Sequence, residues 1–257
     1  MKTRILFICL MCFVNYTYAQ TDFKTFLDSI NWQTNESNFV YKFHAFVTPL
    51  DEQDVWEEEG TESNYSLKGI SVGGIKIADS HLRVKRDNKQ LFRIIFMVLD
   101  NEIDLSKYIK LEESLIKQLG TPIKIGNDLL WLYDKYKINA TLLDLSSVTT
   151  NEIEKYSYAI RAEPVQTYYV DFRAAKIESN NANKSMPNIE YFIIDNDRNI
   201  YIKEKNKSIM IKRVTKVFPS PKGKIMSYDD GMFCYREDNN DIVYIEQGLA
   251  VTYPIIK

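Results

Sequence analysis

The residues from which this chain could build a catalytic serine lie in an unsuitable context. Gly69-Ile70-Ser71-Val72-Gly73 matches the Gly-x-Ser-x-Gly turn that carries the nucleophile of α/β-hydrolases. That turn needs a helix after it and a histidine further along the chain. Residues 74–77 instead continue as a strand, and the only later histidine is His81. We interpret the segment as a glycine-rich bend between two strands.

Histidine and cysteine are scarce. His44 and His81 are the only histidines, and both fall in segments with the pattern of strands. With a carboxylate they could form a zinc site, but no His-x-His, His-Glu-x-x-His or Cys-x-x-Cys spacing is present. Cys234 lies between two aromatic residues, which is typical of a thiol packed in a core. We therefore expect no metal and no cofactor, and the sequence assigns no catalytic residue.

One segment has the start of a calcium-binding loop. Asp195-Asn196-Asp197-Arg198-Asn199 offers alternating oxygen ligands, as an EF-hand loop does. Ile200 stands where that loop needs glycine, and Asn206 stands where it needs glutamate. A polar hairpin turn between two strands fits these residues better.

Two charged segments of opposite sign lie far apart in the sequence. The acidic residues surround Trp56: Asp51, Glu52, Asp54, Glu57, Glu58, Glu59 and Glu62. The basic residues are Lys203, Lys205, Lys207, Lys212, Arg213, Lys216, Lys222 and Lys224. Both segments could simply be solvated surfaces. The more specific hypothesis is a mobile acidic loop that docks a basic partner, because aromatic side chains anchor interfaces while charges steer the encounter. Its candidate binding residues are Trp56, Glu57, Glu58 and Glu59.

Periodicity of the apolar residues predicts an α+β fold. Helices are expected at residues 22–30 and, most clearly, 105–119, where apolar residues recur at helical spacing. Alternating residues predict these strands: 39–47, 65–70, 75–85, 91–99, 129–133, 138–145 and 156–162. The order of these elements along the chain is strands, then one long helix, then further strands. This order predicts an antiparallel β-rich sheet with that helix packed on one face.

The last third of the chain reads as short strands separated by polar turns, which predicts an all-β region over residues 189–257. Residues 178–188 contain few apolar side chains and are expected to be a linker or long loop. The predicted organisation is therefore a signal peptide at 1–19, an α+β domain at 20–177, this linker, and the β-rich region.

The first residues have the layout of a secretory signal peptide. Lys2 and Arg4 precede an apolar run from Ile5 to Val14, and a polar stretch ends at Ala19. The run is about half of the roughly 20 residues that a membrane span needs. Cleavage after Ala19 would remove two of the three cysteines and leave Cys234, so that no internal disulfide could form.

These patterns predict an exported, soluble protein, periplasmic or secreted, with no integral membrane segment after cleavage. The net charge of −2 argues against a nucleic-acid binder. We expect a non-enzymatic binding or interaction module for a protein or glycan, with an inhibitor or immunity protein as one form of it. The alternative is an envelope hydrolase that uses paired carboxylates, a chemistry that leaves no signature in residue spacing.

Overall fold

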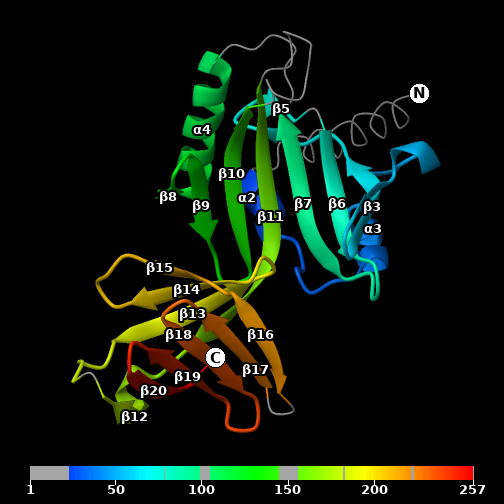
Figure 1. Ribbon diagram of the computed structural model, residues 1–257. Coiled ribbons are helices and arrows are strands. Elements are labelled where there is room, and N and C mark those ends of the chain that lie inside the picture. Colours follow the sequence, from blue (N-terminus) through cyan, green and yellow to red (C-terminus); the bar gives the residue numbers. More distant parts are fainter. Residues whose placement is uncertain are drawn as a thin grey trace, which may run out of the picture. The chain divides into compact units, whose positions relative to one another are not determined.

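The computed structural model describes residues 23–77, 79–98, 105–144, 156–181, 183–220 and 223–256. The chain divides into two compact units, with the division between Pro164 and Val165. Both units are β-rich, and among the described residues every strand pairs with its neighbours in antiparallel orientation (Figure 1). The predicted signal peptide at 1–19 lies outside the described residues.

The first unit is built on one antiparallel sheet, with strand order β1-β3-β6-β7-β11-β10-β9-β8 and with β2 paired to β3. A separate two-stranded hairpin joins β4 to β5. The bounds are β1 (Val47–Pro49), β2 (Trp56–Glu58), β3 (Thr61–Leu67), β4 (Ser71–Val72), β5 (Ile75–Lys76), β6 (Asp79–Lys85), β7 (Leu91–Val98), β8 (Ile123–Ile125), β9 (Asp128–Leu132), β10 (Tyr136–Asp144) and β11 (Tyr156–Tyr169).

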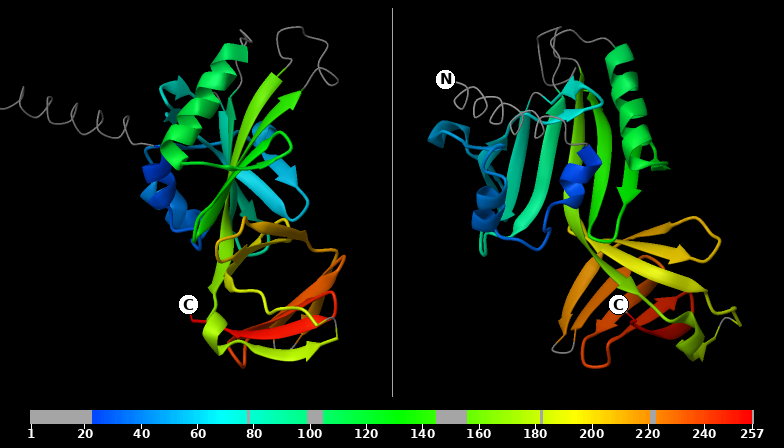
Figure 2. Two further views of the ribbon diagram at one scale, coloured as in Figure 1. Left: turned by 90° about the vertical axis from the view of Figure 1, so that its left-hand side faces the viewer. Right: turned by 180° about the vertical axis from the view of Figure 1, so that it is seen from behind.

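Three helices lie on the same side of this sheet (Figure 2). They are α2 (Phe23–Asp28), α3 (Glu36–Lys42) and α4 (Leu105–Leu119), and the short 3-10 turn η1 (Glu52–Asp54) precedes β2. Helix α4 buries Tyr108, Leu111, Leu115 and Leu119, whose spacing places them on one stripe facing the core. The expectation of one long helix on the sheet is therefore incomplete, because α2, at the helix predicted for residues 22–30, and the unexpected α3 also pack there.

The strand expected at residues 39–47 is wrong. Residues 36–42 form α3 instead, because Asn35 caps the helix by accepting a hydrogen bond from the backbone N–H of Asn38 at 3.0 Å. Phe39 and Phe43, one helical turn apart, both enter the core, whereas Tyr41 is 85% exposed. The apparent alternation of apolar residues hid this local capping signal.

The second unit is all β and consists of two sheets packed face to face. The C-terminal end of β11 pairs with β13 (Ile189–Asp195), which continues to β14 (Asn199–Glu204) and β15 (Met210–Arg213). The other sheet has the order β12-β20-β19-β18-β17-β16. Its bounds are β12 (Lys176–Asn180), β16 (Lys216–Ser220), β17 (Gly223–Tyr228), β18 (Gly231–Arg236), β19 (Asp241–Glu246) and β20 (Leu249–Pro254).

Aromatic residues fill the space between these two sheets. The ring of Phe192 on β13 lies 5.3 Å from Phe233, 5.9 Å from Tyr244 and 6.1 Å from Tyr253, centroid to centroid. All four side chains are fully buried. Contacts of this kind supply a core without any disulfide.

The segment expected to be a linker carries structure at its start, because β12 covers Lys176–Asn180 as an edge strand. The predicted domain boundaries at 177 and 189 remain a prediction. No helix among the described residues is long and apolar enough to cross a bilayer.

Candidate functional site

The acidic segment around Trp56 is ordered as a hairpin. Strand β2 pairs with β3, Trp56 opposite Ser63, and Gly60 takes the positive φ of 73° that the turn requires. The Trp56 side chain is 52% exposed, and its ring lies 5.0 Å from the ring of buried His81 on β6. The structure therefore holds an exposed tryptophan in a fixed position.

Two of the three glutamates after Trp56 have partners within the same unit. Glu58 forms an ion pair with Arg83, whose side chain is 10% exposed, and Glu57 pairs with Arg86 at 3.3 Å, where both groups are at least half exposed. Glu59 instead borders a hollow of about 540 Å³, together with Gly60, Thr61, Lys85, Arg86, Asp87 and Phe92. Two of the acidic side chains are thus neutralised by β6 and the turn after it.

The remaining candidates from the sequence occupy structural positions. Ser71 lies in the β4–β5 hairpin, with Gly73 and Gly74 at positive φ in the turn, as the interpretation of a glycine-rich bend predicted. His44 is exposed in the turn after α3, with Nδ1 3.1 Å from the carbonyl oxygen of Tyr41, so its expected place in a strand is wrong. Cys234 is half-buried and is not part of the core cluster, so its expected place in the core is wrong. Partial burial still raises the pKa of its thiol, which disfavours the thiolate that a nucleophile requires.

The calcium-like segment is a hairpin turn between β13 and β14, which confirms that interpretation of the sequence. Asp195 accepts hydrogen bonds from the backbone N–H of Asn199 at 2.7 Å, from its side-chain amide at 2.9 Å and from the hydroxyl of Tyr201 at 2.8 Å. These three hydrogen bonds to Asp195 stabilise the turn.

Two lysines of the basic segment are neutralised within the second unit. Lys212 pairs with Asp230 and Glu246, and Lys207 pairs with Glu204. Lys205 instead lines a pocket that the sequence did not indicate. Lys222 lies outside the described residues.

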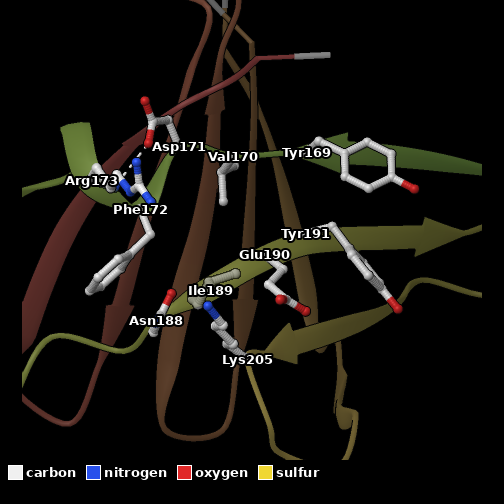
Figure 3. A pocket seen from close by; sticks show the side chains of 10 residues that line it. All are labelled: Tyr169, Val170, Asp171, Phe172, Arg173, Asn188, Ile189, Glu190, Tyr191 and Lys205. Atoms are coloured by element: carbon white, nitrogen blue, oxygen red, sulfur yellow. Dashed lines mark hydrogen bonds between the residues drawn. The ribbon is translucent and has the colours of Figure 1, made fainter.

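That pocket, of about 570 Å³, forms in the second unit where two paired strands separate (Figure 3). The backbone N–H of Val170 donates to the carbonyl of Glu190 at 3.1 Å, after which the chain turns into the 3-10 helix η2 (Phe172–Ala174). The lining residues are Tyr169, Val170, Asp171, Phe172, Arg173, Asn188, Ile189, Glu190, Tyr191 and Lys205. Buried Val170 and Ile189 give it an apolar base.

Aromatic and charged side chains occupy different ends of the pocket. Tyr169 and Tyr191 are cross-strand partners whose rings meet edge to face, 5.6 Å apart, at one end. Figure 3 shows Phe172 and Arg173 at the other end, with Glu190 and Lys205 between them. A ligand in this pocket would therefore meet an aromatic wall and a cation at opposite ends.

The three charged side chains at the rim, Arg173, Glu190 and Lys205, are exposed. None of them forms an ion pair or side-chain hydrogen bond with the residues that the structure describes. Asp171 differs because its carboxylate has a partner: it accepts a hydrogen bond from the backbone N–H of Arg173 at 2.9 Å. Two cations and one carboxylate are thus available to a ligand.

Sequence reasoning missed this pocket because its two walls are 15 or more residues apart and meet through strand pairing. Lys205 was noticed only as one of many basic residues, and the two tyrosines have the alternation of ordinary strand residues. Comparison of the chain with models of known protein families, with curated proteins and with solved structures found no match.

Proposed function

We propose that this chain is an exported, non-enzymatic binding protein whose second unit takes a glycan bearing a carboxylate. The observation that carries the proposal is the pocket in which the Tyr169–Tyr191 pair stands opposite exposed Arg173, with Lys205 between them. Its volume lies within the range of about 300–1,000 Å³ that is usual for small-molecule sites.

The chemistry of the lining favours a sugar acid over a purely apolar ligand. A pyranose ring has an apolar C–H face that packs on tyrosine rings, whose hydroxyls stay at the wet end. Arg173 presents a planar fork of donors that matches a carboxylate, and Lys205 adds a second positive charge. Glu190 and Asn188 can bind sugar hydroxyls.

A glycan array tests the ligand class. The wild type should be retained by carboxylated glycans more strongly than by their neutral counterparts, and Tyr191→Ala should lose most of that signal. Tyr41→Ala is the matched control, because Tyr41 is an exposed tyrosine of the first unit. Retention of no carboxylated glycan, or equal signals for the two variants, would refute the assignment.

Hydrolysis by paired carboxylates is the alternative function, and the pocket contains two acids, Asp171 and Glu190. If the pair were catalytic, incubation with a bound glycan would yield shorter products, and Glu190→Gln would abolish them while binding continued. Our proposal predicts that the glycan is recovered intact from the wild type.

A second candidate is protein docking through the hairpin, as in an inhibitor or immunity protein. It is favoured by Trp56, which remains half exposed although its ring contacts His81, as an interface anchor does. Glu59 has no ion pair with the residues that the structure describes, and together with Asp51, Glu52 and Asp54 in and next to η1 it would select a basic partner.

Export is the part of the proposal that rests on the first 19 residues, and we place the protein in the periplasm or outside the cell. Intact-mass analysis of the protein from the producing cell should give a chain that begins at Gln20. A chain that still carries Met1 would contradict export by this signal.

A further inference from the structure

We infer that the outer face of the six-stranded sheet in the second unit is an interface between two copies of this chain. Along each strand of this sheet, side chains alternate between the two faces. Phe233, Tyr244 and Val251 represent the inner face and are at most 1% exposed, because they pack in the core. The outer face carries apolar side chains as well.

Strand register groups the outer apolar residues into two adjacent rows. Phe218, Ile225, Cys234 and Val243 are successive cross-strand partners from β16 to β19. Met232, Ile245 and Ala250 form the next row, from β18 to β20. Seven apolar residues therefore lie together on five neighbouring strands.

This surface is accessible within its unit. Phe218 is 46% exposed and Met232 is 38% exposed, and the other five residues are half-buried by their neighbours on the sheet. In the part of the chain that the structure describes, the core of this unit includes none of the seven. Contiguous apolar patches on a protein surface mark interaction sites.

Charges at the two edges of the face indicate what covers it. Lys216 is on the outer face of edge strand β16, in the row of Met232, because its partner Ser227 also pairs with Met232. At the opposite edge, exposed Glu178 accepts a hydrogen bond from the outer residue Thr252 at 2.8 Å, and exposed Lys176, the strand partner of Thr252, is on the same face. Arg236 and Asp241, also outward, neutralise each other through two hydrogen bonds of 2.7 Å.

A second copy satisfies this arrangement. A two-fold axis in the interface and parallel to the strands places edge β16 of one copy over edge β12 of the other, so that Lys216 of each meets Glu178 of its partner. The apolar rows then cover each other, as in face-to-face sheet packing. None of the residues that line the pocket is on this face, so the dimer is independent of glycan binding.

Sedimentation velocity of the purified chain over a micromolar concentration range tests the inference. The wild type should dimerise, and Met232→Lys and Phe218→Lys should each raise the dimer dissociation constant by about tenfold or more. Ile109→Lys is the control, because Ile109 is an exposed apolar residue of α4 in the other unit. A wild type that stays monomeric, or a dimer unaffected by both variants, overturns the inference.

Charge reversal tests the orientation of the two copies and needs no change in the apolar rows. Lys216→Glu and Glu178→Lys should each weaken the dimer, and the double variant should restore it. Weakening without restoration would exclude this packing and point to another partner on the face.

Discussion

The guanidinium of Arg93 donates two hydrogen bonds to one oxygen of Glu163, from Nε at 3.1 Å and from Nη2 at 2.9 Å. The other oxygen lies 2.6 Å from Nζ of Lys137. The three side chains are at most 9% exposed and come from β7, β11 and β10, which are neighbours in the sheet. One buried carboxylate therefore joins three strands of the first unit.

Replacing that carboxylate should be costly. Glu163→Gln removes the negative charge that both buried cations contact, and we expect the free energy of unfolding to fall by about 3–5 kcal/mol. Urea denaturation measures this change. Glu190→Gln, at an exposed rim position, is the control and should change stability by less than about 0.5 kcal/mol. Equal effects of the two substitutions would show that the buried cluster does not hold the sheet.

The hairpin that bears Trp56 offers a matched pair of ion pairs. Glu58→Gln leaves the buried guanidinium of Arg83 without its carboxylate, and we expect a loss of about 1–3 kcal/mol. Glu57→Gln removes the exposed partner of Arg86 and should cost less than about 1 kcal/mol. Chemical denaturation compares the two variants, and amide exchange at Trp56–Glu58 should accelerate more in Glu58→Gln. The reverse order would contradict the role given to Arg83.

In the second unit, Lys212 joins β15 to Asp230 and Glu246. Burial alone would lower the pKa of Lys212, but hydrogen bonds to Glu246 and Asp230 outweigh it, and the pKa is raised. The hydrogen bond from Lys212 lowers the pKa of Asp230. Because the pKa of Asp230 is lower in the folded chain than the unfolded value of about 3.8, its ion pair stabilises the fold at pH values above about 3.8. This contribution is lost as the pH falls through the folded pKa. For Lys212, whose folded pKa is raised, the contribution is fully present at pH values below about 10.5 and is lost as the pH rises through the folded pKa.

Lys212→Met should therefore lower the free energy of unfolding by about 1–2 kcal/mol at neutral pH. The difference from the wild type should shrink in acid, as Asp230 becomes protonated, and again in strong base. Denaturation curves at several pH values measure it. A difference that stays constant from neutral to acidic pH would show that the ion pair contributes nothing.

Docking through the hairpin can be tested without disturbing its ion pairs. Trp56→Ala combined with Glu59→Gln removes the exposed ring and the glutamate that has no ion-pair partner among the described residues, and it leaves Glu57 and Glu58 in place. The double variant should unfold like the wild type but lose capture of a basic protein in a pull-down from the native envelope. Capture that is unchanged would remove the hairpin from consideration.

Local patterns in the sequence predicted most strands, because alternation and turn residues act over a few neighbours. They failed at residues 36–42, where the cap formed by Asn35 and the packing of Phe39 and Phe43 decide for a helix. They also could not show that Arg93 meets Glu163 or that Tyr169 meets Tyr191, because strand register brings these residues together. The proposed glycan site was least predictable, since the residues that line the pocket are common types at ordinary spacing.

Titration calorimetry with an oligosaccharide of glucuronic acid tests the proposed function most directly. We predict that the wild type binds it and that Arg173→Gln and Lys205→Gln each weaken binding by about tenfold or more, the loss of one charge-assisted hydrogen bond. The corresponding glucose oligosaccharide should bind less tightly than the acid. Equal affinity of the wild type and both variants, or equal binding of the neutral and acidic sugars, would contradict the account.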